Sequence, residues 1–146
     1  MATLRALPKT VLSGDATLSA LLTGGIKDAQ NLPRDGGGLS SAPKVAGTPR
    51  IQLHAVIRWR ADKPFGPETV QSENTSFEVY LYDHAGYVNI ETAVGLIKAL
   101  LHRQRFQADD RQFVYINWVF TSGELTAEEY AGAPCRFMRF EVTAVR

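Results

Sequence analysis

From residue 51 onward, apolar and polar side chains alternate along much of the chain with a period of two, which is the spacing of a half-buried β-strand. Such runs occupy residues 51–60, 69–83 and 135–145. The run 112–122 is apolar at both alternating positions, so we expect it to lie centrally in a sheet or to be covered on both faces. The first two runs are joined by a turn rich in proline and glycine, which predicts an antiparallel pair.

Other segments have helical spacing instead. Residues 87–104 carry apolar side chains three and four positions apart, which predicts the longest helix of the chain. Residues 3–12 show the same spacing over a shorter length, and Asp15 is suited to cap a second short helix that stops before Gly24. The chain has 146 residues, which fits one domain over residues 1–146. The predicted fold class is α+β: a mainly antiparallel four-stranded sheet with one long helix across one face and short N-terminal helices.

Residues 33–49 differ from the rest because seven of these 17 positions are glycine or proline. Such a composition buries too little apolar surface to offset the entropy lost on ordering the backbone. We expect a long loop that becomes ordered against a partner. Its Gly36–Gly38 run lacks the preceding strand and the following helix of a phosphate-binding loop.

The composition is that of an ordinary globular domain with balanced charge. Hydrophobic residues make up 45% of the chain and the formal net charge is +1, so no overall field favours nucleic acid or an acidic membrane. No segment reaches the ~20 apolar residues that span a bilayer, and the first residues lack the apolar run of a secretion signal. We therefore expect a soluble protein of a reducing compartment.

The reactive residue types form no recognisable catalytic or metal-binding pattern. No two of the three histidines are three or four residues apart, as a metal site on one helix would need. Cys135 is the single cysteine and begins a predicted strand, where a buried thiol is commoner than a nucleophile. The acidic pairs Asp109-Asp110 and Glu128-Glu129 lie in predicted polar turns. The sequence thus predicts no enzyme, no cofactor and no metal.

Basic side chains form the remaining candidate site. One group lies in the long loop and the other lies on a polar strand face and its exit. These positions suit a solvated face or a protein interface better than nucleic acid, because the net charge is balanced. The predicted interface residues are Arg34, Lys44, Arg50, Arg58, Arg60 and Lys63.

Four stretches resemble a known family. They are Leu18–Ile26, Phe77–Tyr82, Ala93–Leu101 and Arg136–Val142. In overall pattern they resemble the tail-terminator, or tail-completion, proteins that join head and tail in long-tailed bacteriophages. The resemblance covers most of the chain except residues 33–49.

The resemblance implies a virion protein of the phage neck, assembled in the host cytoplasm. It implies a homo-oligomeric ring, expected to be a hexamer, that caps the tail tube and binds the head-side connector, with DNA passing through its channel without specific recognition. It also implies no enzymatic activity. A head–tail stopper or adaptor of the same neck is an alternative. Another is a small ligand-binding domain or enzyme that uses Asp83, His84 and Cys135.

Overall fold

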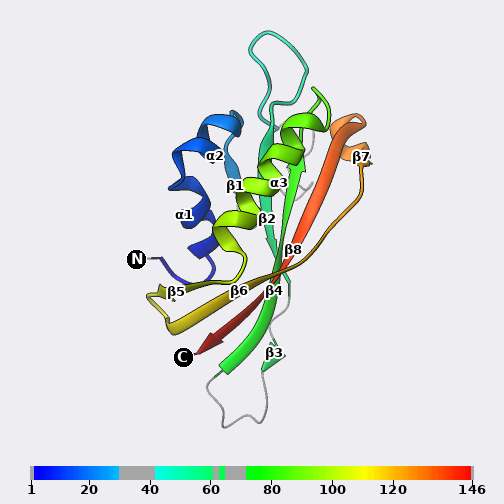
Figure 1. The fold of residues 1–146 in the computed structure, drawn as a ribbon. Helices are drawn as coiled ribbons and strands as arrows, with labels where there is room; N and C mark the ends of the chain where they lie inside the picture. Colours follow the sequence, from blue (N-terminus) through cyan, green and yellow to red (C-terminus); the bar gives the residue numbers. More distant parts are fainter. Residues whose placement is uncertain (1, 30–41, 61–62, 65–71, 146) are drawn as a thin grey trace.

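The computed structural model describes residues 2–29, 42–60, 63–64 and 72–145. Within them the chain forms one curled sheet with three α-helices packed against it (Figure 1). The helices are α1 (Leu7–Ser13), α2 (Ala16–Leu21) and α3 (Val88–Leu101), and a short 3₁₀ helix, η2, covers Glu128–Tyr130. No helix in the described ranges is long and apolar enough to cross a membrane.

The sheet has eight strands and is mixed. Its main path runs β1-β2-β4-β8-β6-β5, with β3 paired to β4 and β7 paired to β8. Strands β1 and β2 are parallel, and the other pairs are antiparallel. The strand bounds are β1 (Ile26–Asp28), β2 (His54–Trp59), β3 (Lys63–Pro64), β4 (Ser72–Tyr82), β5 (Gln104–Ala108), β6 (Arg111–Thr121), β7 (Leu125–Ala127) and β8 (Ala133–Val145).

The predicted fold class is therefore wrong. A mainly antiparallel four-stranded sheet with one long helix was expected, whereas the sheet has eight strands in mixed directions and its longest helix has only 14 residues. The difference is clearest after α3. His102 is extended and Arg103 has a φ of 58°, so the chain turns sharply and β5 begins within the segment predicted to be helical. Short strands β1 and β7 also arise where the residues show no period-two pattern.

The antiparallel pair predicted for the first two long strands is confirmed, because β2 pairs with β4 in a register that sets Ile57 opposite Val79. The apolar run at 112–122 becomes β6, between β8 and β5. Its two faces differ. Val114 and Ile116 are buried toward the helices, whereas Phe113 and Val119 are 37% and 40% exposed.

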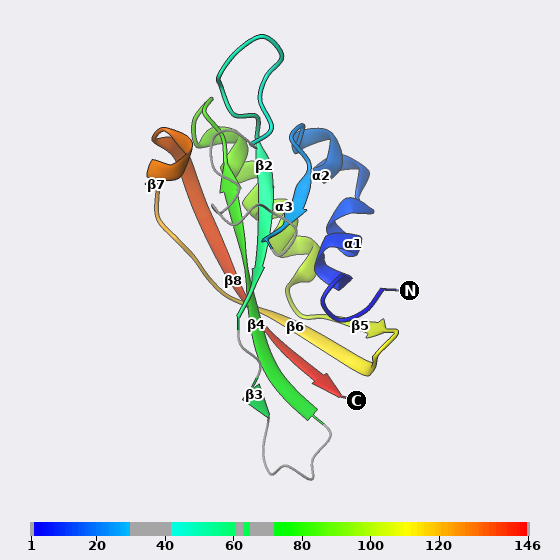
Figure 2. The same ribbon diagram turned by 180° about the vertical axis from the view of Figure 1, so that it is seen from behind.

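The three helices cover one face of the sheet, as seen from both sides (Figures 1 and 2). Pro8 lies in the first turn of α1, where backbone N–H groups have no acceptor within the helix, so the N–H that proline lacks costs no hydrogen bond. Asp15 caps α2 by accepting a hydrogen bond from the Leu18 amide at 2.9 Å. The main core consists of leucines and isoleucines of the helices packed on buried strand residues such as Phe77, Val79 and Phe140.

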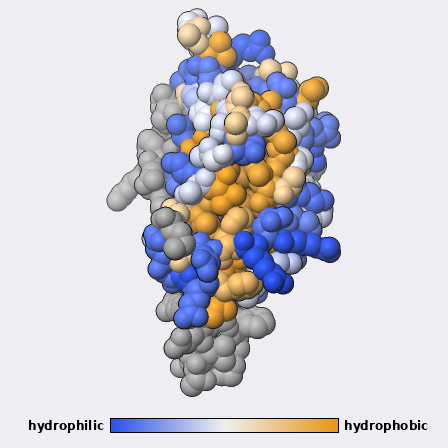
Figure 3. All heavy atoms as spheres, turned by 60° about the vertical axis from the view of Figure 1, so that its left-hand side comes forward, coloured by the Kyte–Doolittle hydropathy of each residue, from blue (hydrophilic) through white to orange (hydrophobic). Residues whose placement is uncertain are grey.

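A second, smaller core lies on the opposite face of the sheet, beneath η2. It includes Val56, Tyr82, Cys135 and Tyr130. Apolar side chains also gather in the middle of the side that carries α1 and α2 (Figure 3). Both faces of the upper sheet thus contribute to packing.

The first residues of the described chain link distant parts of the sheet. The Leu4 amide donates to Asp110 Oδ1 at 2.8 Å, and the Asp109 amide donates to the Ala2 carbonyl at 2.8 Å. A few residues on, the Arg5 carbonyl accepts a hydrogen bond from the Trp59 indole at 3.1 Å. The segment therefore connects the β5–β6 turn to β2.

Candidate interaction surface

Charged side chains form a row across the sheet on the face away from the helices. The strand registers set Arg58 opposite Glu78, Glu78 opposite Arg139, and Arg139 opposite Phe120. Arg139 donates to Glu78 Oε2 from Nε at 3.2 Å and from Nη2 at 2.9 Å. Arg60 lies 3.8 Å from the same carboxylate. We call Arg58, Arg60, Glu78, Arg139 and Phe120 the basic face.

The burial of these groups is uneven. The side chain of Glu78 is only 9% exposed, whereas those of Arg139 and Arg60 are 33% and 52% exposed. One buried carboxylate therefore orients arginines whose outer surfaces remain available to a partner. Arginine is suited to this position, because its planar group can pair on one side and bind on another.

Aromatic rings continue this face. The ring of Phe137 stacks on Tyr80 at 5.1 Å between centroids and meets the edge of Phe120 at 5.5 Å. Arg58 lies over Tyr80 and Arg139 over Phe120, at 5.5 and 5.0 Å from the ring centroids. Burial raises the pKa of the Tyr80 hydroxyl, and the negative charge of Glu78 adds to the effect. Arginine and aromatic groups together are typical of binding surfaces.

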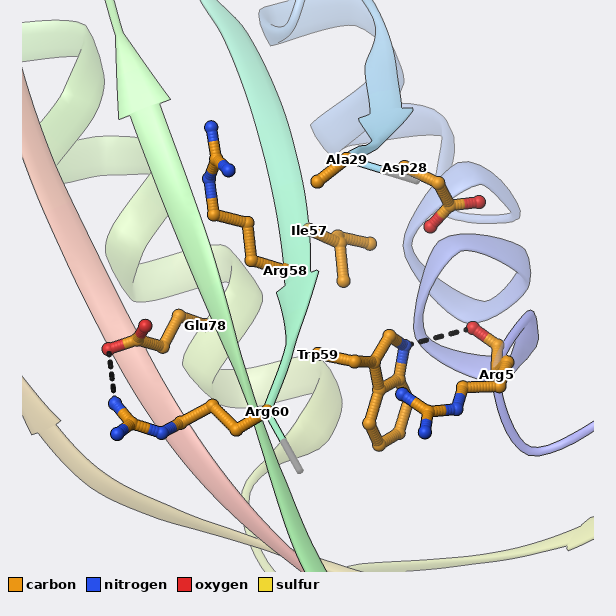
Figure 4. A pocket seen from close by; sticks show the side chains of 8 residues that line it. All are labelled: Arg5, Asp28, Ala29, Ile57, Arg58, Trp59, Arg60 and Glu78. Carbon is orange, nitrogen blue, oxygen red and sulfur yellow. Dashed lines mark hydrogen bonds and ion pairs between the residues drawn. The ribbon is translucent and has the colours of Figure 1, made fainter. Parts of the chain in front are cut away.

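A cavity of about 650 Å³ opens beside this row (Figure 4). Arg5 lies 5.0 Å from the ring centroid of Trp59, and Arg58, Arg60, Asp28 and Glu78 add charged groups to the lining. Burial raises the pKa of the Asp28 carboxyl, although Lys9 opposes the shift. The cavity lining thus holds three arginines and two carboxylates.

The predicted interface residues do not form one site. Arg58 and Arg60 belong to the basic face, as the period-two pattern of their strand suggested. Lys44 and Arg50 lie in a separate hairpin, where Lys44 forms a β-bridge with Ile51. Arg50 donates to the His84 carbonyl at 3.2 Å and lines a second cavity, of about 500 Å³.

The remaining basic residues are described in part or not at all. The structure describes the backbone of Lys63, which pairs with Asn74. Arg34 lies outside the described residues, as do residues 30–41 of the predicted loop, including Gly36–Gly38.

The groups considered for a catalytic alternative have structural roles. The His84 ring accepts a hydrogen bond from the Ile51 amide at Nδ1, at 2.7 Å, so its Nε2 carries the proton that it donates to the Tyr130 carbonyl at 3.0 Å. Asp83 is buried and accepts from the Ala85 amide at 3.0 Å. Cys135 is buried in the smaller core. Within the described ranges, no group of three or more histidine, cysteine or acidic residues is arranged to hold a metal ion.

Sequence reasoning missed Glu78, Arg139 and the aromatic rings as parts of the surface. The period-two pattern places Glu78, Tyr80, Phe137 and Arg139 on the polar side of their strands, whereas the run that holds Phe120 is apolar at both alternating positions. It does not reveal that β4 and β8, about 60 residues apart, pair with Glu78 opposite Arg139. Knowledge of that strand register would have been needed to recognise these residues as parts of one surface.

The structure is a domain of one mixed, curled sheet, with one face covered by short helices and the opposite face rich in arginine and aromatic groups. No family model matches the sequence, and no curated protein matches it. Among solved structures, the chain is similar to one from the "Virion of native gene transfer agent (GTA) particle", with a TM-score of 0.69 and 14% sequence identity. The match covers 99% of this chain and 96% of that one, so the two share a fold over their whole length.

Proposed function

We propose that this protein is a structural component of a phage-like virion. The observation that carries the proposal is the fold shared over 99% of the chain with a protein of a gene transfer agent virion. The arginine-rich and aromatic sheet face supports an assembly role, since such surfaces bind other proteins.

Within the virion, we propose the role of a tail terminator: a ring of copies of this chain, hexameric, that caps the tail tube and meets the head-side connector. The four stretches that resemble this family fall on α2 to β1, β4, α3 and β8. These elements supply most of the main core. In this role the protein acts by binding and not by catalysis, and DNA passes through the ring without being read.

The predicted basic residues then divide between two kinds of contact. We propose that Arg58 and Arg60, with Lys63 just beyond, contact a neighbouring subunit. Arg34, Lys44 and Arg50 would contact the tube or the connector. The division follows from the separation of the 44–51 hairpin and the basic face in the fold.

The role is tested by measuring the mass of the purified protein with light scattering after size exclusion, over concentrations from micromolar to near-millimolar. Negative-stain images of the same fractions should show rings, and added tail tubes should acquire a cap at one end. A protein that stays monomeric at every concentration and never joins tubes would contradict the proposed function.

A further inference from the structure

The second cavity, of about 500 Å³, opens beside the hairpin at 44–51, which rises at the top of the molecule in Figures 1 and 2. The end of α2, the hairpin, the turn between β4 and α3, and the first turn of α3 all contribute to its lining. Within that described lining, Asp83 and Arg50 are the charged residues. These two residues therefore decide which charges a ligand of this cavity carries.

Asp83 is the buried charge of the cavity, since only 4% of the residue is exposed. Its Oδ1 accepts a hydrogen bond from the Ala85 amide at 3.0 Å, and no ion pair among the described residues includes its carboxylate. Burial keeps the pKa of His54 below its ordinary value although Asp83 opposes the shift, so this ring supplies no positive charge at neutral pH. A buried carboxylate is costly until a cation pairs with it, so Asp83 favours a cationic group in the cavity.

Arg50 is the exposed charge of the same cavity. Its Nη2 donates to the His84 carbonyl at 3.2 Å, and the ion pairs of the described chain do not join it to Asp83. This guanidinium repels a lone cation that approaches the cavity, whereas it attracts an acidic group. The arrangement therefore suits a ligand that carries both charges, with its basic group directed inward and its acidic group left near the solvent.

Apolar side chains line the cavity as well. Ile51 and Leu53 are buried and Leu21 is half-buried. The methylene stem of a lysine or arginine packs against such walls while its charged end reaches a polar group. Val45 also lines the cavity and is 44% exposed, so it belongs to the rim. The cavity is thus matched to a long basic side chain.

We infer that this cavity is a docking site for another protein of the virion, which inserts a lysine or arginine side chain that pairs with Asp83 while an acidic side chain beside it pairs with Arg50. The inference rests on the proposed function, because it names the chemistry that the tail tube or the connector presents to the 44–51 hairpin.

The first test uses a small probe of this chemistry, the blocked peptide acetyl-Ala-Lys-Glu-Ala-amide. The control peptide has norleucine in place of lysine, which keeps the stem and removes the charge. In a titration followed by methyl nuclear magnetic resonance, the signals of Ile51 and Leu53 should shift with the lysine peptide. The norleucine peptide should bind about tenfold more weakly, because it lacks the charged group that pairs with Asp83.

Two variants make the titration specific. Asp83→Asn removes the charge and keeps a side-chain oxygen for the Ala85 amide, and Val45→Trp fills the rim while leaving Asp83 in place. Each should bind the lysine peptide about tenfold more weakly than the wild type. The matched control is Glu124→Gln, which neutralises an exposed carboxylate outside the described lining and should bind as the wild type does. Circular dichroism verifies that all three fold.

The second test mixes rings of each variant with tail tubes and, separately, with connectors. Asp83→Asn and Val45→Trp should form rings as the wild type does, because the described lining shares no residue with the basic face, and should dock about tenfold more weakly to one of the two structures.

Unchanged peptide binding by Asp83→Asn, or unchanged docking to both structures, would overturn the inference while the proposed function stands. Loss of the rings themselves in both variants would place a second copy of this chain in the cavity, which also contradicts the inference. If the wild type forms no rings and caps no tubes, the proposed function is wrong, and the peptide titration alone decides whether the cavity binds this chemistry.

Discussion

At the scale of single residues, His54 is held neutral inside the smaller packing layer. Its side chain is buried, its Nδ1 lies 2.9 Å from the Gln52 carbonyl, and its ring stacks on Tyr82 at 5.3 Å. Burial lowers the pKa of His54 from its ordinary value of 6.5, and Lys27 adds to the lowering, although Gln52 and Asp83 oppose it. The folded protein therefore resists taking up this proton.

This resistance predicts a pH dependence of stability. Below pH 6.5 the unfolded chain protonates His54 while the folded chain does not, so the unfolded state binds more protons and the free energy of unfolding falls. The fall continues down to the lowered folded pKa and then stops for this group. Urea denaturation of the wild type and His54→Gln between pH 7.5 and 5 should show a shallower slope for the variant. Equal slopes would contradict this role.

A second residue-scale prediction concerns Glu73, which is buried and paired with Arg111. Glu73→Ala leaves the Arg111 guanidinium, whose side chain is only 13% exposed, without this partner. We expect a loss of about 3 kcal/mol in the free energy of unfolding. The matched control is Glu91→Ala, which breaks an exposed pair with Arg136 and should lose less than about 1 kcal/mol. Similar losses for the two variants would contradict the role assigned to burial.

At the scale of elements, α3 contains a glycine that its packing does not require. Gly95 lies on the exposed side of the helix, and a methyl group added there would meet no atom within 4 Å. Gly95→Ala should therefore raise the free energy of unfolding by about 0.5–1 kcal/mol, because alanine loses less backbone entropy in a helix. Thermal melts provide the measurement.

Gly24 provides the contrast to Gly95. A Cβ at Gly24 would lie 2.8 Å from the Cβ of His54 and 3.0 Å from the Leu53 carbonyl oxygen. Gly24→Ala should lower the melting temperature, since backbone or a rigid side-chain stem must shift. A stable Gly24→Ala variant would show that the segment before β1 moves more easily than its packing indicates.

The elements that the sequence predicted are those with long, regular patterns. The helix expected over 87–104 appears as α3, three residues shorter at its end, and the long strands appear near their expected places. The missed strands β1, β3, β5 and β7 have two to five residues, too few to show an alternation. Strand β1 is moreover fixed by a distant partner, through its register with Ala55–Ile57. A pattern read along the chain contains no information about such contacts, and the strand count was therefore wrong.

The candidate site shows the same limit. The alternation along β2 identified Arg58 and Arg60 as polar-face residues. Their relation to Glu78, Arg139 and Phe120 depends on the order β2-β4-β8-β6. Lys44 and Arg50, which were expected in the long loop and apart from that strand, lie in the hairpin at 44–51, and their role at an interface stays a prediction.

At the scale of the whole molecule, the hairpin provides a prediction that separates folding from assembly. Replacing Arg34, Lys44 and Arg50 by glutamate should leave the monomer folded, because the described contact of the Arg50 side chain is one bond to a backbone carbonyl. Docking to the tail tube or connector should weaken as the charge reverses. Circular dichroism and the yield of complete virions measure the two effects, and an unchanged yield would contradict the role of these residues.

Strand β8 lies between β4 and β6 in the sheet but follows both of them in the sequence, as well as β7. During synthesis on the ribosome, β4 and β6 therefore each keep one unpaired edge until residues 133–145 have emerged. A nascent chain stopped short of that point has no joined sheet and presents open strands to its neighbours, where aggregation begins. Completing the sheet without aggregation therefore depends on residues 133–145 reaching both open edges promptly.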